Sequence, residues 1–173
     1  NVGKCNSMKN VLIVLMALCF GNIYGLNDKQ GVAVKVINVI DGNTVEILTE
    51  ENEVYKIILK EVDSPEIGQE YGDQAKKFTE GLLLKKKVFV EMKGKDMWGN
   101  RLASITLKNG KKMEEELLKA GMAWHNTLKS TDITLAQLES NTKDKKVGLW
   151  ANTDPMAPWI FRRQQSMTSA KSL

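Results

Sequence analysis

Val62-Asp63-Ser64-Pro65-Glu66 is the stretch of this sequence that says most about its fold and its chemistry. It ends a β-branched segment, residues 54–62, that is typical of a strand, and Pro65 then restricts the turn between the two carboxylates. Two carboxylates placed by one rigid turn can hold a hard cation and activate a water molecule. The same residues would also suit a solvated turn at the end of a strand, with no ligand at all.

The segments around this turn alternate between strand and helix patterns. Predicted strands share β-branched residues and flanking turn sequences: residues 34–40, 44–48, 54–62, 88–92 and 101–107. Predicted helices share apolar residues at helical spacing: residues 73–84, 113–120 and 135–145, the first with Asp73 as its N-cap. This order predicts an α+β fold, a five-stranded OB-type Greek-key β-barrel with three α-helices.

The chain begins with a pattern typical of a targeting segment. Met8-Lys9-Asn10 forms a short basic start and residues 11–20 are an unbroken apolar run followed by small residues. We therefore expect residues 1–27 to be an N-terminal extension plus signal peptide, with Met8 as the true start. The protein is then exported, periplasmic or secreted, without stable membrane insertion after cleavage. An uncleaved segment that anchors it in the membrane is the alternative.

Composition sets limits on the predicted mature protein, which has one domain at residues 32–163 and a C-terminal tail at 164–173. The formal charge of the whole chain is +4, but Lys4 and Lys9 lie in the segment expected to be removed. So small an excess does not by itself indicate nucleic-acid binding. Cys5 and Cys19 also lie in that segment, so no disulfide or thiolate metal site is expected in the domain.

A series of short motifs, in this order and spacing, resembles the staphylococcal nuclease (thermonuclease-like) family over almost the whole predicted mature chain. The motifs are Asp41-Gly42-Asn43-Thr44, the turn at 62–66, and residues 95–103, 118–124, 148–150 and 158–163. The resemblance implies metal-dependent hydrolysis of phosphodiester bonds in DNA or RNA, usually with calcium.

The resemblance also implies roles for particular residues. Asp63 and Glu66 would be catalytic, with Glu66 contacting the attacking water as general base. Asp63, the Ser64 carbonyl and Asn43 would hold the metal. The family has an aspartate where Asn43 stands, so the Ca²⁺ site is expected to be weakened.

Two arginines of the family pattern are missing, because Ile58 and Asn100 stand at their positions. In the family these arginines stabilise the negative charge of the transition state, and one such donor is worth about 10²–10³ in rate. We therefore expect weakened activity. Lys56 and Lys60 are expected on the same strand face as Ile58 and could replace the lost charge in part.

Four residues are candidates for binding nucleic acid or phosphate: Lys56, Lys60, Trp98 and Arg101. Each has a plainer interpretation, since lysines on a strand can simply be solvated and Trp98 can pack within its own loop. Arg162 and Arg163 are expected to be solvated on a tail held by Trp159, with nucleic-acid contact as the alternative.

Three functions remain open at this point. The first is an exported, weakened nuclease that acts on DNA or RNA as a monomer. The second is a non-catalytic OB-type module that binds nucleic acid, with single strands favoured, or another polyanion, through the four candidate residues just named. The third is an envelope interaction module that retains only the scaffold.

Overall fold

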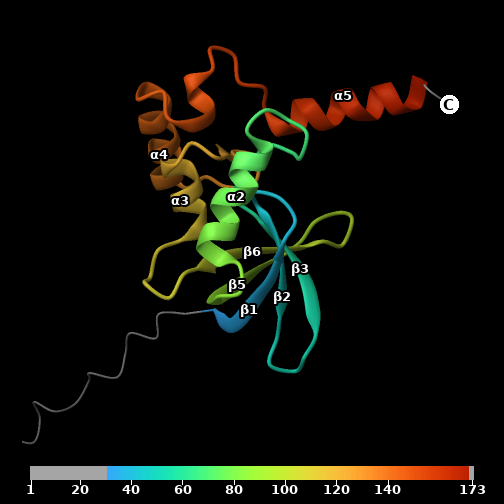
Figure 1. Cartoon of the computed structure of the whole chain (residues 1–173), viewed down its shortest axis with the longest axis vertical. Helices are drawn as coiled ribbons and strands as arrows, with labels where there is room; N and C mark the ends of the chain where they lie inside the picture. The colour runs from blue at the N-terminus through green and yellow to red at the C-terminus, as the bar shows by residue number, and fades with distance from the viewer. Residues whose placement is uncertain (1–30, 172–173) are drawn as a thin grey trace, which may run out of the picture.

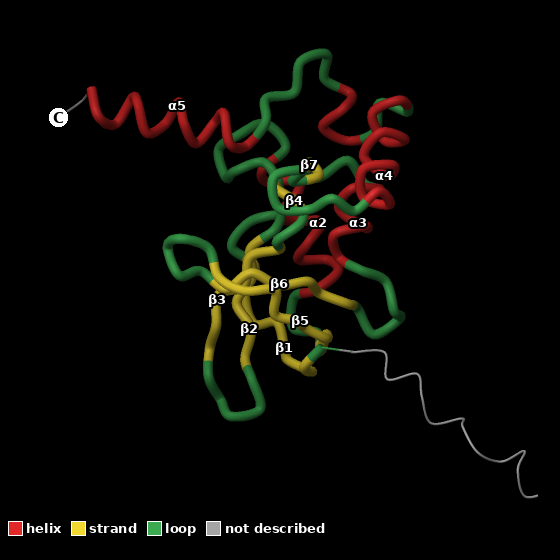
Figure 2. The backbone as a smooth tube through the Cα atoms, turned by 180° about the vertical axis from the view of Figure 1, so that it is seen from behind, coloured by secondary structure: helices red, strands yellow, loops and turns green. Residues whose placement is uncertain are grey.

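The computed structural model describes residues 31–171, so the predicted signal segment lies outside the described residues. Its centre is a closed barrel of five strands in the order β1-β2-β3-β6-β5 (Figures 1 and 2). The strands are β1 (Val32–Val39), β2 (Thr44–Leu48), β3 (Val54–Leu59), β5 (Lys87–Lys95) and β6 (Arg101–Thr106). Only the β3–β6 pair is parallel among these neighbours. The predicted OB-type barrel is therefore confirmed.

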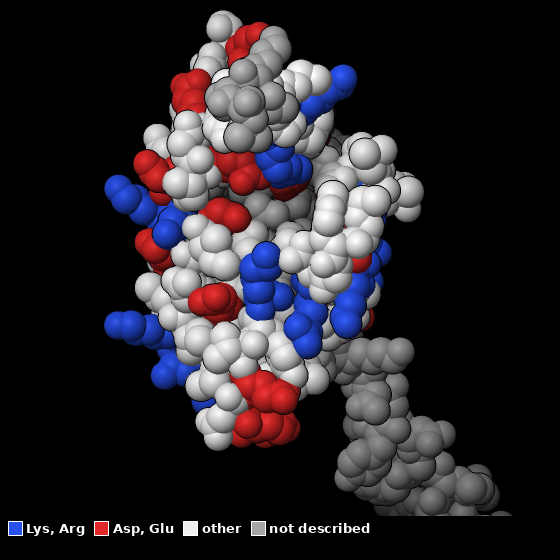
Figure 3. Space-filling model, turned by 90° about the vertical axis from the view of Figure 1, so that its right-hand side faces the viewer, with Lys and Arg blue, Asp and Glu red and all other residues white. Residues whose placement is uncertain are grey.

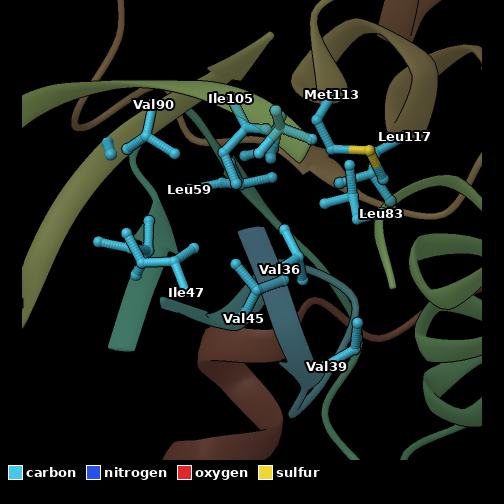
Figure 4. Packing of buried hydrophobic residues seen from close by; sticks show 14 of the residues in the cluster. Val36, Val39, Val45, Ile47, Leu59, Leu83, Val90, Ile105, Met113 and Leu117 are labelled. Carbon is cyan, nitrogen blue, oxygen red and sulfur yellow. The ribbon is translucent and has the colours of Figure 1, made fainter. Parts of the chain in front are cut away.

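Apolar side chains from alternate strand positions fill the barrel (Figure 4). Along β1, Val34 and Val36 are buried, but the next buried residue is Val39 because the register shifts between Val36 and Asn38. Such a bulge moves the side-chain alternation by one residue. Strand β1 therefore keeps its apolar side chains in the core up to the turn that follows it.

Helices cover one end of the barrel. They are α2 (Gly72–Leu83), α3 (Met113–Lys119), α4 (Ile133–Asp144) and α5 (Pro158–Lys171), with a short 3₁₀ helix at Gly148–Ala151. Leu83 of α2 and Met113 and Leu117 of α3 reach the barrel core (Figure 4). Beside these helices, β4 (Val62–Asp63) and β7 (Trp124–His125) form a two-stranded antiparallel ribbon (Figure 2).

Two helix starts differ from the sequence prediction. Helix α2 begins at Gly72 after Tyr71, whose φ is 66°, and no side chain caps it, so Asp73 is not the N-cap. The chain leaves the turn in a left-handed conformation that places Asp73 inside the first helical turn. Helix α4 begins at Ile133 because Asp132 accepts hydrogen bonds from the N–H groups of Thr134 and Leu135.

The predicted tail is largely helical. Helix α5 continues across the predicted boundary at residue 163 and adds a helix to the three that the sequence indicated. Pro158 stands at its first position, where a missing N–H costs nothing. The helix projects away from the barrel (Figure 1). Of the residues that the structure describes, no helix combines the length and apolar character needed to cross a membrane.

Candidate active site

The short ribbon brings the first candidate carboxylate to the edge between the barrel and the helices. Asp63 pairs with Trp124 across β4 and β7, and both residues are buried. The strand end therefore delivers Asp63 as the sequence predicted. Ser64 and Pro65 follow in buried positions and turn the chain toward Glu66, whose side chain is 30% exposed.

The turn between β1 and β2 packs directly against this segment. The Asn43 side-chain oxygen accepts a hydrogen bond from the Ser64 N–H over 3.1 Å. A Cβ on Gly42 would lie 2.5 Å from the Ser64 Cβ, so only glycine allows this approach. Thr79 of α2 donates to the Gly42 carbonyl oxygen over 2.6 Å. The two turns and α2 therefore pack as one unit. Within it, the Asn43 side-chain oxygen is already hydrogen-bonded to the Ser64 backbone N–H.

A third carboxylate lies within the same turn. Asp41 accepts a hydrogen bond from the Asn43 N–H over 2.9 Å. Burial raises the pKa of Asp41, with hydrogen bonds from Thr44 and Asn43 opposing the shift and the nearby charge of Glu66 adding to it. Asp41 therefore stabilises the turn, and its proximity to Glu66 adds negative character to the site.

The loop after Glu66 is held by Gln69. The Glu66 N–H donates to the Gln69 side-chain oxygen over 3.0 Å. The amide nitrogen of the same side chain donates to the Met156 carbonyl oxygen over 2.6 Å. Gln69 thus connects the loop that carries Glu66 to the segment that leads into α5.

The strongest feature of the site is an arginine that the sequence analysis assigned to a solvated tail. Arg162 of α5 donates from Nη1 to Asp63 Oδ1 over 3.1 Å and from Nη2 to Asp63 Oδ2 over 2.8 Å. Its Nη1 also donates to Glu66 Oε1 over 2.5 Å. Hydrogen bonds to Asp63, followed by those to Glu66, raise the pKa of Arg162, which is charged in any case. The expectation of a solvated arginine is therefore wrong, although its side chain remains 48% exposed.

The position of Arg162 carried a signal in the sequence. It stands four residues after Pro158, and residues at this spacing lie on the same face of a helix. Reading residues 158–163 as a helix with Pro158 at its start would have placed Arg162 on the face that Pro158 buries against the protein. The sequence-based expectation of a solvated tail did not use this spacing.

The predicted basic residues divide between two faces of β3. Lys56 is exposed, and Ile58 and Lys60 are half-buried at alternating positions. The Arg101 guanidinium stacks on Tyr55, with 3.7 Å between Cζ and the ring centroid. Because neighbouring strand residues point to opposite faces, Tyr55 holds Arg101 away from the face of Lys56. Lys56 and Arg101 therefore do not lie on the same face.

The loop between β5 and β6 contains the other two positions of interest. Trp98 is 78% exposed and Met97 is 86% exposed, so neither packs within the loop. Asn100 donates from Nδ2 to Asp96 Oδ2 over 2.8 Å and closes the loop. Figure 3 shows the face toward which α5 points, where acidic and basic side chains lie together near α5 and further basic side chains gather over the barrel.

An OB-type barrel with an aspartate and a glutamate meeting at the end of a strand has the architecture of staphylococcal-nuclease-like enzymes. The profile of the family described as staphylococcal nuclease homologue matches residues 56–152. An uncharacterized endonuclease of Haemophilus influenzae is 31% identical over 162 residues, which cover 94% of this chain and 90% of the relative. The chain belongs to the staphylococcal nuclease family, as the sequence motifs predicted.

Further relatives carry nuclease names. Staphylococcal-like nuclease CAN1 of Arabidopsis thaliana is 36% identical over 115 residues, covering 64% of this chain and 34% of the relative. Micrococcal nuclease of Shigella flexneri is 27% identical over 139 residues, covering 75% and 79% of the two chains.

The family is generally calcium-dependent, but the donors of this site do not fit a calcium ion as they lie. Both Asp63 oxygens are bonded to Arg162, and the Asn43 oxygen is bonded to Ser64. Within residues 31–171, no three Asp, Glu, His or Cys side chains form a metal-binding group. Calcium takes about six to eight oxygen ligands. A cation at Asp63 would first have to displace the Arg162 guanidinium.

Proposed function

We propose that the protein hydrolyses phosphodiester bonds in nucleic acids, with Asp63 and Glu66 as its catalytic carboxylates. The observation that carries the proposal is the convergence of both side chains on a single guanidinium nitrogen, Arg162 Nη1. Carboxylates that meet at one point can act on the same phosphate. The endonuclease names of relatives that span most of the chain support the same reaction class.

The environments of the two carboxylates suggest different roles. Asp63 is buried and fixed by two hydrogen bonds to Arg162, so it is suited to orienting charge rather than to moving a proton. Glu66 is 30% exposed, so a water molecule can reach its carboxylate and lose a proton to it. Glu66 is therefore our candidate general base.

The activity is proposed to be weak compared with a family member that has the full set of charges. Ile58 is half-buried and apolar, and the Asn100 side chain is bonded to Asp96, so neither supplies a cation. Preorganised cations are a major source of stabilisation for phosphoryl transfer. Calcium dependence is a general property of the family, and it enters the proposal on that ground alone.

Digestion of labelled oligonucleotides by the purified protein tests the proposal. Single-stranded DNA, double-stranded DNA and RNA are each incubated with calcium, magnesium or chelator, and wild type is compared with Glu66→Gln. We expect slow cleavage that Glu66→Gln abolishes. Asp73→Asn, on the first turn of α2, is the matched carboxylate control and should cleave like wild type. No cleavage by wild type, or equal cleavage by Glu66→Gln, would contradict the proposal.

Binding without hydrolysis is the second candidate function. Trp98 and Met97 are exposed at the tip of one loop, where an aromatic ring can stack on an unpaired base. This favours single-stranded nucleic acid as the ligand. Oligonucleotide binding in the absence of any cleavage, lost in Trp98→Ala, would support this function in place of the enzyme.

Export is proposed from the apolar run at residues 11–20. Mass spectrometry of the protein recovered outside the cytoplasm should find an N-terminus between residues 19 and 28. An intact N-terminus would favour the anchored alternative.

A further inference from the structure

We propose that Arg162 is the phosphate-binding arginine of this site, supplied by the C-terminal helix in place of arginines absent at positions 58 and 100. The inference rests on the proposed function, because it names the cation that would contact the substrate phosphate.

No other cation takes this position. Among the described residues, only Arg162 forms an ion pair with Asp63 or with Glu66. Ile58 has no charge, and Asn100 is bonded within its own loop. A nuclease needs positive charge where the phosphate gains negative charge in the transition state. Arg162 is the described side chain that supplies it next to both carboxylates.

The guanidinium keeps donors for a further ligand. An arginine has five N–H donors. Asp63 and Glu66 take both donors of Nη1 and the Nη2 donor that faces Asp63. The Nε–H and the second Nη2–H lie on one edge of the planar group, and no described residue accepts from them. Two parallel donors on such an edge match two oxygens of a phosphate.

The position of Arg162 is fixed by contacts of the helix turn that precedes it. Trp124 pairs with Asp63, and the Trp159 ring packs edge-on against Trp124 with 6.4 Å between ring centroids. Pro158 is buried at the start of the same helix, and Figure 2 shows this start beside the β4–β7 ribbon. The ribbon that presents Asp63 therefore also anchors the helix turn that presents Arg162.

The two carboxylates orient the guanidinium. Holding an arginine in one rotamer before the substrate arrives reduces the entropy lost on binding. The two negative charges also offset the positive charge of Arg162. Binding of a phosphate there therefore depends less on overall charge attraction than on directed hydrogen bonds from the free edge of the guanidinium. This favours a positioned donor that acts on the reacting phosphate over a general attraction for nucleic acid.

Substitution of Arg162 tests the inference, with its neighbour as control. Arg162→Gln removes the charge, Arg162→Lys keeps it without the planar fork, and Arg163→Gln removes an exposed charge from the same helix. Cleavage of a single-stranded oligonucleotide is measured as kcat and KM, and binding by fluorescence anisotropy in chelator over a salt series. Thermal unfolding of each variant establishes that it is folded.

We expect Arg162→Gln to lower kcat/KM by about 10²–10³-fold, with part of the loss recovered in Arg162→Lys. The slope of log affinity against log salt should fall by about 0.7, the value for one phosphate contact to a single strand. Arg163→Gln should stay within about twofold of wild type. Adding Ile58→Arg to Arg162→Gln should restore activity in part by returning a cation to the site.

The outcomes separate this inference from the proposed function. Faster cleavage by Arg162→Gln would show that the guanidinium blocks the carboxylates, and unchanged cleavage would show that it is dispensable; either overturns the inference while the nuclease stands. Oligonucleotide binding that depends on Arg162 without cleavage by wild type would support the inference and reject hydrolysis. Neither binding nor cleavage by folded wild type would reject both.

Discussion

The side-chain amide of Gln69 donates a hydrogen bond to the backbone carbonyl oxygen of Met156, with 2.6 Å between the two atoms. The Gln69 side-chain oxygen also accepts from the Glu66 N–H, so a single side chain connects the loop that carries Glu66 to the segment that leads into α5. The residues it joins are far apart in sequence. The loop that carries Glu66, the proposed general base, and the segment that leads into α5 are therefore joined by one buried side-chain amide.

Gln69→Ala should destabilise the protein by about 1–3 kcal/mol, because it leaves two backbone groups without their partner. It should also reduce oligonucleotide cleavage, since Glu66 and Arg162 lose a shared support. Gln137→Ala is the control, because among the described residues the Gln137 side chain bonds only Asn141, on an exposed helix face. Chemical denaturation and cleavage rates check both. Equal effects of the two variants would contradict the coupling.

Gly42→Ala should destabilise the fold by about 1–3 kcal/mol and disturb the site, because the added Cβ would lie 2.5 Å from the Ser64 Cβ and 2.8 Å from the Ala75 Cβ. Gly81→Ala is the matched control in α2, where nothing lies within 4 Å of the added carbon. That substitution should stabilise the protein by about 0.5–1 kcal/mol through helix propensity. Urea unfolding measures the two changes in the free energy of unfolding, which should have opposite signs. A Gly42→Ala variant as stable as wild type would contradict the tight packing at Gly42.

Glu114 should make stability depend on pH. Burial raises the pKa of Glu114 to about 7, against nearby hydrogen-bond donors and with a small contribution from the charge of Glu61. Between its ordinary pKa of 4.5 and about 7, the folded protein holds a proton that the unfolded chain has released. The free energy of unfolding should therefore fall as pH rises through this window, by up to about 3 kcal/mol, and then level off.

Glu114→Gln should remove this dependence and stabilise the protein above pH 7, with little effect near pH 4. Glu115→Gln is the control, since the one ion pair that the Glu115 side chain forms with a described residue is with Lys119. Denaturation curves from pH 4 to pH 9 compare the three proteins. The prediction would be contradicted if the free energy of unfolding of wild type rose with pH across this window while that of Glu114→Gln did not.

Trp98→Ala should weaken binding of single-stranded oligonucleotides by about 1–3 kcal/mol, the value of one stacked base, and leave thermal stability unchanged. The reason is its 78% exposure at the loop tip. Leu128→Ala removes a side chain that is 97% exposed elsewhere and should change neither quantity. Anisotropy titrations with single- and double-stranded probes measure the difference. A lower melting temperature with unchanged binding would mean that Trp98 has a structural role.

Asn43→Asp, Ile58→Arg and Asn100→Arg combined should raise calcium-dependent DNA cleavage by several orders of magnitude, because each restores a charge of the family pattern. Asn43→Asp keeps an oxygen acceptor for the Ser64 N–H, whereas Asn100→Arg gives up the bond to Asp96. Single substitutions should do little, since charges that act on one transition state are not additive. Cleavage assays on a folded triple variant, with each single variant beside it, decide this. If the triple variant cleaves DNA no faster than wild type, the prediction is wrong and Arg162, rather than the missing charges, limits the rate of cleavage.

Local patterns were sufficient for most of the barrel. The strand at Thr44–Leu48 was predicted to the residue, because β-branched alternation and the preceding turn sequence are both local signals. The family motifs likewise identified Asp63 and Glu66 as a candidate pair. The bulge in β1 and the left-handed start of α2 at Tyr71 were not predicted, because both arise where elements are joined to the rest of the fold.

The sequence by itself determined which residues form the barrel, which turn carries the carboxylates, and which family charges are absent at Asn43, Ile58 and Asn100. Only the tertiary structure decided what stands in their place. Arg162 lies 99 positions along the chain from Asp63, and nothing in its neighbours specifies a carboxylate partner. The packing of Trp159 on Trp124 brings the two together, and such a contact depends on folded distances rather than on spacing in the chain.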